Sequence, residues 1–137
     1  MVSLPSNGKI IYYSLFLIIF IISISFRLPD LTRRPMHTDE AVQAVKFGEL
    51  LGNNFYRYNS VEYHGPTLYY LTLIPAWIQS ARNIREIDET TVRLVPAVFG
   101  ILSVLILPLF REGLSRKVVI AAGFLTAVSP AMVFYSR

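Results

Sequence analysis

The stretch that decides the fold is Ile10–Phe26, with the sequence IIYYSLFLIIFIISISF. About 17 residues follow one another without a charged side chain, and Arg27 ends the run. A helix that rises about 1.5 Å per residue would cover about 25 Å here, which is close to the hydrocarbon thickness of a bilayer. A cleaved signal peptide is the rival interpretation, but Arg27-Leu28-Pro29-Asp30 offers no small-residue cleavage site. We therefore predict an uncleaved membrane anchor over residues 10–26.

The composition of the whole chain is that of a membrane protein. Of its 137 residues, 53% are hydrophobic and 16% are charged, and the mean hydropathy is +0.48. The net charge of +4 is spread over short polar segments and is not gathered on one face. This distribution argues against nucleic acid as a partner and favours membrane lipid. Because the chain contains no cysteine, any metal site would need His or carboxylate ligands.

Two further apolar runs, residues 94–110 and residues 118–135, lie in the second half of the chain. Both contain proline and glycine, which membrane helices tolerate where neighbouring helices satisfy the backbone. The short basic turn Arg111–Lys117 between them is typical of a cytoplasmic connection, as is Lys9 before the first run. We predict an all-α integral membrane protein with three transmembrane helices, 10–26, 94–110 and 118–135, and a cytoplasmic N-terminus.

Two shorter helical patterns lie between the first and second predicted spans. In residues 39–52, polar side chains recur every three residues, which indicates an amphipathic helix. Residues 66–80 begin with Pro66, which suits the first turn of a helix, but their apolar part is only about 11 residues long. An even number of crossings must separate two cytoplasmic ends. We therefore predict two extracytoplasmic juxtamembrane helices, 39–52 and 66–80.

Ionisable side chains cluster where the first juxtamembrane helix begins, at His37, Asp39 and Glu40. One interpretation is an ordinary helix start, with Thr38 as the N-cap and both acids favoured by the helix dipole. The other is a functional site, since adjacent carboxylates and an imidazole at a membrane surface are costly to desolvate. The residues by themselves leave both interpretations open.

In their order along the chain, five motifs resemble the N-terminal part of the integral-membrane glycosyltransferases of the GT-C class. They are Asp39-Glu40-Ala41, His64-Gly65-Pro66-Thr67-Leu68-Tyr69-Tyr70, Arg93-Leu94-Val95-Pro96-Ala97, Ser129-Pro130 and Tyr135-Ser136-Arg137. The chain is most similar to proteins related to the dolichyl-phosphate-mannose protein mannosyltransferases and the lipid A aminoarabinose transferase. It also resembles the prokaryotic subgroup described as flippase-activity-associated. The resemblance implies the N-terminal part of a longer, multi-span enzyme of a prokaryotic plasma membrane, a part that would be inactive alone.

The resemblance also implies a reaction and roles for individual residues. In that class, a sugar passes with inversion from a polyprenyl-phosphate donor to a hydroxyl of a protein or glycan acceptor, as in protein glycosylation. Asp39 would be the general base, and Glu40 would support it or bind a metal. His64, in the place of a metal-binding acid in relatives, and His37 are candidate ligands of a divalent metal ion. Arg93 and Arg137 would bind the lipid phosphate, unless they only extend toward the membrane surface.

Two other function classes stay open at this point. The first is a non-catalytic membrane protein that supports translocation of lipid-linked oligosaccharide. The second is an ion or solute transporter, which would need acidic residues within its spans. The three predicted spans contain no Asp or Glu, and this disfavours the transporter.

Overall fold

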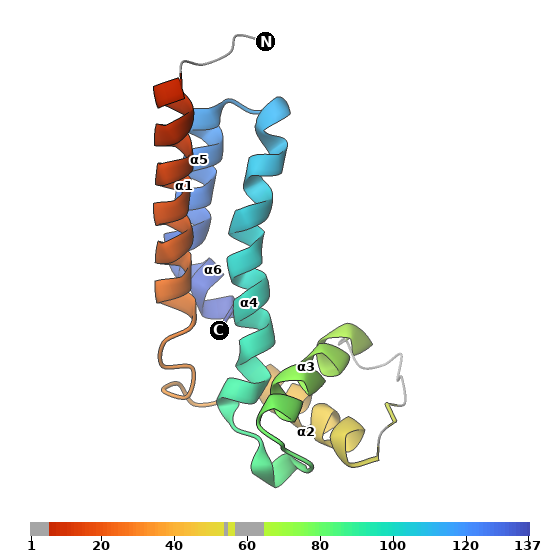
Figure 1. Cartoon of the computed structure of the whole chain (residues 1–137). Coiled ribbons are helices and arrows are strands. Elements are labelled where there is room, and N and C mark those ends of the chain that lie inside the picture. Colours follow the sequence, from red (N-terminus) through yellow and green to blue (C-terminus); the bar gives the residue numbers. More distant parts are fainter. Residues whose placement is uncertain (1–5, 54, 57–64) are drawn as a thin grey trace. The chain divides into compact units, whose positions relative to one another are not determined.

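The computed structural model describes residues 6–53, 55–56 and 65–137, and every regular element in these residues is a helix. The prediction of an all-α fold is confirmed for this part of the chain. Figure 1 shows the elements, which are α1 (Ser6–Arg27), α2 (Thr38–Asn53), α3 (Pro66–Ile78), the short 3-10 helix η1 (Ile84–Glu86), α4 (Glu89–Ile106), the 3-10 helix η2 (Leu107–Glu112), α5 (Arg116–Val128) and α6 (Pro130–Tyr135).

The chain forms two compact units. Residues 1–29 and 97–137 make up the first, here named the terminal unit, and residues 30–96 make up the second, the central unit. The helix α4 is shared, because its first residues belong to the central unit and its later ones to the terminal unit. Each unit has its own core.

Two helical stretches, Asn7–Arg27 and Glu89–Glu112, are long and apolar enough to cross a membrane. In their most apolar parts, only 22% and 33% of the residues are buried, whereas a core helix of a soluble protein would be mostly buried. Large apolar side chains such as Ile10, Leu17 and Ile21 are exposed along α1. These features indicate a membrane protein.

The predicted span 118–135 is interrupted. α5 ends at Val128, and α6 begins at Pro130 after Ser129, whose φ of −57° and ψ of 123° are not helical. Proline lacks the N–H that a continuing helix needs, and it disfavours the helical conformation in the residue before it. Among the residues that the structure describes, two candidate spans are therefore found where three are predicted.

The predicted span 94–110 corresponds to a helix that starts earlier and changes type before its end. α4 begins at Glu89, and after Ile106 the chain continues as η2, with Pro108 in its first turn. At the start, the carboxylate of Asp88 accepts hydrogen bonds from the Thr91 N–H at 2.8 Å and from the Thr91 hydroxyl at 2.9 Å. Such side-chain bonds satisfy N–H groups that the first turn of a helix leaves unpaired, so they fix the first residue of α4.

The core of the terminal unit lies between α1, α4 and α5. α1 and α5 lie side by side (Figure 1), and the buried side chains between the helices are those of Phe16, Ile19, Val104, Val119 and Ala127. Gly100 of α4 is needed for a close approach. A Cβ atom there would lie 2.5 Å from Cβ of Ser136 and 2.9 Å from Nε of Arg27.

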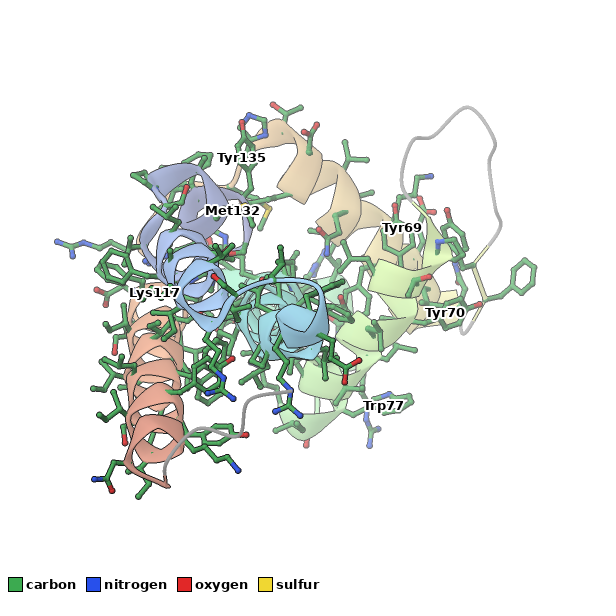
Figure 2. The ribbon with its side chains drawn as sticks, turned by 90° about the horizontal axis from the view of Figure 1, so that it is seen from above. Tyr69, Tyr70, Trp77, Lys117, Met132 and Tyr135 are labelled. Atoms are coloured by element: carbon green, nitrogen blue, oxygen red, sulfur yellow. The ribbon has the colours of Figure 1, made fainter. Side chains whose placement is uncertain are left out.

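In the central unit, α2 packs against α3 around Phe47, Leu50, Tyr56 and Tyr69. The rings of Tyr56 and Tyr69 are 4.9 Å apart, and Phe47 and Tyr69 are fully buried. Four exposed apolar side chains occupy the other side of α3, namely Tyr70, Ile74, Trp77 and Ile78. Figure 2 shows Trp77 projecting outward from α3, on the side away from α2.

α3 ends two residues before the predicted boundary at 80. Ser80 adopts a positive φ of 59°, and its N–H donates to the Trp77 carbonyl at 3.0 Å. The N–H of Ala81 donates to the Ala76 carbonyl at 2.9 Å. This pair of bonds is the Schellman arrangement that terminates many helices, here with serine in the place usually taken by glycine.

Candidate functional site

The ionisable cluster predicted from the sequence forms the N-terminal end of α2. Thr38 is the first helical residue, so His37 and not Thr38 holds the N-cap position. The His37 carbonyl accepts the first helical bond, from the Ala41 N–H at 2.9 Å, and its Nδ1 accepts from the Asp39 N–H at 3.4 Å. The Glu40 carboxylate reaches back to the His37 N–H at 3.0 Å. Two side chains thus cap the helix reciprocally, with histidine in the place where serine or threonine is usual.

Glu40 is the centre of a charged cluster that we name the Glu40 cluster: Glu40, Arg34 and Arg93. One carboxylate oxygen binds Nη2 of Arg34, and the other binds Nη2 of Arg93 at 2.8 Å. Burial by itself would raise the pKa of Glu40. The hydrogen bonds from Arg93 and from the His37 N–H, together with the charges of Arg93 and Arg34, outweigh burial and lower this pKa below its ordinary value. Glu40 is therefore ionised at neutral pH, and both its oxygens are occupied.

Arg93 holds the connector that leads from α1 to α2. Its guanidinium is 3% exposed and donates to the carbonyls of Leu31, Arg34 at 3.0 Å and Pro35 at 3.3 Å, in addition to Glu40. A buried guanidinium is stable only when its donors find acceptors, and here backbone carbonyls of a proline-containing connector supply most of them. The two arginines around one carboxylate leave the Glu40 cluster with a net positive charge.

Asp39 differs from its neighbour Glu40 in being open to solvent. Its side chain is 75% exposed, and that of His37 is 63% exposed. The Asp39 Oδ2 and His37 Nδ1 atoms are 3.8 Å apart. An exposed carboxylate whose oxygens accept no hydrogen bond within the described residues can take a proton from an incoming hydroxyl, whereas the paired oxygens of Glu40 cannot do so without breaking ion pairs. The two acids, which stand together in the sequence, therefore have different environments.

The structure brings together His37, Asp39, Glu40 and Arg93 in the central unit. Arg137 belongs to the terminal unit, where its guanidinium donates to the carbonyls of Phe26 at 3.0 Å and Pro29 at 2.8 Å, beyond the last turn of α1. His64 lies outside the described residues. The roles of Arg93 and Arg137 in phosphate binding, and of His64 in metal binding, stay predictions.

In the described residues, no three His, Asp or Glu side chains stand close enough together to hold a metal ion. His37 and Asp39 would supply two ligands at most, because the oxygens of Glu40 are bound by arginines. Divalent-metal binding at this site stays a prediction, because the candidate ligand His64 lies outside the described residues.

A cleft of about 190 Å³ lies within the central unit. Its lining residues are Met36, Ala44, Ile84, Ile87, Asp88, Glu89 and Val92. Burial would raise the pKa of Asp88, but hydrogen bonds from the N–H and hydroxyl of Thr91 and from the side chains of Thr90 and Gln79 lower it. The cleft therefore combines apolar walls with an ionised carboxylate.

Sequence reasoning missed Arg34 and Arg27. Arg34 lies in the connector six residues before Glu40, and no periodic pattern links the two positions. Arg27 looks like the polar end of a span, yet it is fully buried. Comparisons of the chain with protein-family models, with curated proteins and with solved structures gave no significant match.

Proposed function

We propose that this chain contributes the extracytoplasmic reaction site of a membrane glycosyltransferase of the GT-C kind. In this proposal, a sugar passes from a polyprenyl-phosphate donor to an acceptor hydroxyl, and Asp39 is the general base. The observation that carries the proposal is the exposed Asp39 carboxylate, which accepts no hydrogen bond within the described residues and adjoins the positively charged Glu40 cluster in sequence, in a chain with two helices able to cross a membrane.

In the proposed reaction, Asp39 takes the proton of the acceptor hydroxyl through one carboxylate oxygen. The hydroxyl oxygen attacks the anomeric carbon, the bond from that carbon to the phosphate oxygen breaks, and the phosphate leaves with the electron pair. A positioned base of this kind contributes roughly 10²- to 10⁴-fold to the rate. His37, whose Nδ1 accepts from the Asp39 N–H, would fix the orientation of the helix end that carries the base.

The leaving phosphate gains charge as its bond breaks, so positive groups near it lower the barrier. The Glu40 cluster supplies an excess of one positive charge from Arg34 and Arg93. Arg34 is the more accessible of the two, since 29% of its side chain is exposed against 3% for Arg93. Glu40 takes no part in proton transfer in this proposal and acts as a positioning residue for both arginines.

The experiment that tests the proposal is the Asp39→Asn variant, assayed for sugar transfer in membranes that contain the protein and a polyprenyl-phosphate-linked sugar. Asparagine keeps the size of the side chain but cannot take the proton, so transfer should fall at least about 10²-fold. The matched control is Glu49→Gln, which removes an exposed carboxylate from the same helix and should leave transfer unchanged.

Unchanged transfer by Asp39→Asn would remove Asp39 from the mechanism. The translocation alternative predicts a different pattern. In that case, lipid-linked oligosaccharide would accumulate on the cytoplasmic side when the protein is absent, and Asp39→Asn would not change transfer.

A further inference from the structure

At the end of the terminal unit where η2 leads into α5, two arginine side chains contact two tyrosine side chains of α1. Nη1 of Arg111 lies 3.3 Å from the hydroxyl of Tyr13, and the guanidinium of Arg116 lies over the ring of Tyr12, 5.7 Å from its centroid. Both tyrosines belong to the N-terminal part of α1. The loop between η2 and α5 is therefore fixed against α1 at this end of the unit.

Among the described residues, basic side chains outnumber acidic ones at this end. Arg116 and Lys117 occupy the first turn of α5, which contains no acidic residue. The N-terminus of a helix carries partial positive charge, so cations there are unfavourable. Lys9 lies one helical turn before Tyr12 and Tyr13 on α1 and adds a further positive charge. The turn between η2 and α5 has one carboxylate, that of Glu112, and it forms no ion pair within the described residues.

A second observation at the same place concerns the hydroxyl of Tyr12. The residue is 5% exposed, and its hydroxyl has no hydrogen-bond partner in the part of the chain that the structure describes. Leaving a buried hydroxyl unpaired costs on the order of 1–3 kcal/mol. The unpaired hydroxyl belongs to the same ring over which the Arg116 guanidinium lies, so an unused donor and a cation occur on one side chain pair.

We propose that this region, which we name the Tyr12 site, binds the phosphate group of an anionic phospholipid. The Tyr12 site consists of Lys9, Tyr12, Arg111, Arg116 and Lys117. A phosphate would accept from the free Tyr12 hydroxyl and from the guanidiniums, and it would offset the positive charge at the start of α5. Figure 2 looks onto this end of the unit and labels Lys117.

The apolar surroundings favour a lipid over a free anion. Leu109 and Phe110, directly before Arg111, are 76% and 56% exposed, and Leu114 in the following turn is 46% exposed. A phospholipid would place its acyl chains on these side chains and its phosphate on the cations. This inference rests on the two candidate spans and does not depend on the proposed sugar transfer.

The test is a native mass spectrum of the detergent-solubilised protein after titration with phosphatidylglycerol, with phosphatidylcholine, or with inorganic phosphate. We expect retention of phosphatidylglycerol, little retention of phosphatidylcholine, and no comparable binding of inorganic phosphate. Comparable retention of inorganic phosphate would overturn the assignment to a lipid.

The sharpest variant is Tyr12→Phe, because it removes one hydroxyl and no charge. We expect it to lower the affinity for phosphatidylglycerol roughly tenfold, the usual effect of losing a hydrogen bond to a charged group. Arg116→Gln should lower the affinity at least as much. The control is Arg85→Gln, which removes an exposed cation from η1 and should leave the affinity unchanged.

Equal retention of phosphatidylglycerol by the wild type, Tyr12→Phe and Arg116→Gln would overturn the Tyr12 site. An equal loss in Arg116→Gln and Arg85→Gln would also overturn it, because only overall charge would then matter. Lys117→Gln provides a fourth variant at an exposed position, so the test does not depend on the folding of the Arg116 variant.

Discussion

At the scale of single residues, Arg27 is the buried cation of the terminal unit. Its guanidinium is fully buried and donates to the carbonyls of Thr126 at 2.7 Å and Ala127 at 2.9 Å, and to the hydroxyls of Ser23 and Ser136, both at 3.0 Å. In a continuous helix, the Thr126 carbonyl would accept from the N–H of residue 130, but that residue is proline. Arg27 thus supplies a donor that the break between α5 and α6 removes.

We predict that Arg27→Gln destabilises the protein by about 2–5 kcal/mol, because a shorter amide leaves buried carbonyls without donors. Thermal unfolding in detergent would measure the change. The matched control is Arg33→Gln, at a side chain that is 83% exposed, where the expected change is within about 0.5 kcal/mol. Equal melting temperatures for the two variants would contradict this role of Arg27.

Glu40 should make the stability depend on pH. The pKa of Glu40 is lower in the folded protein than its ordinary value of 4.5. The stabilisation that the ionised carboxylate gives to the folded state is therefore fully present above pH 4.5, and it is lost as the pH falls through the lowered pKa. We therefore expect the wild type to be more stable than Glu40→Gln at neutral pH, with a difference that shrinks in acid. Urea unfolding at several pH values would show this. A difference independent of pH would mean that the charge of Glu40 does not contribute.

The residue scale is where prediction from the sequence is weakest. The cluster His37, Asp39 and Glu40 is visible in the sequence, but the different environments of the two acids are not, because Arg34 and Arg93 reach Glu40 through the tertiary fold. The burial of Arg27 is likewise set by chain segments about 100 residues later. Such long-range hydrogen bonds leave no periodic pattern in a single sequence.

At the scale of elements, most helices follow from local signals. The start of α3 was marked by Pro66, and the starts of α2 and α4 lie beside capping carboxylates. The interruption within residues 118–135 has a local cause too, since the apolar pattern continues through Ser129-Pro130 although the backbone hydrogen bonds do not. A hydropathy average measures how apolar a segment is. It does not register that Pro130 lacks the backbone N–H that a continuous helix needs at this point.

The exposed face of α3 leads to a prediction about Trp77, the one tryptophan of the chain. Trp77 is 66% exposed, and Tyr70 and Ile74 lie on the same face. If α3 is a juxtamembrane helix, this face should lie at the level of the lipid headgroups, where Trp and Tyr are enriched. In vesicles, Trp77 emission should be blue-shifted and quenched by lipids brominated near the headgroup. Efficient quenching by iodide instead would show that Trp77 faces water.

At the scale of the whole molecule, the predicted topology can be tested with single cysteines, because the chain has none of its own. We expect Asn53→Cys and Asp88→Cys to react with an impermeant reagent added from outside intact cells, and Ser115→Cys to react only after permeabilisation. Asn53 lies at the end of α2, and Ser115 is the N-cap of α5. Reaction of Asn53→Cys and Asp88→Cys from opposite sides would mean that α3 crosses the membrane.

The position of Arg27 also bears on biosynthesis. Its hydrogen-bond acceptors outside α1 follow 99 to 109 residues later in the chain. At about 5–20 residues per second, a ribosome needs roughly 5–20 s to make that length. During this interval the Arg27 guanidinium can bond only to Ser23 within α1, and the translocon or lipid phosphates must solvate its other donors until α5 and α6 emerge. The terminal unit therefore completes its folding late in translation. If a ribosome stalled before Ser129, α1 would be inserted in the membrane without the packing of Arg27 against α5 and α6.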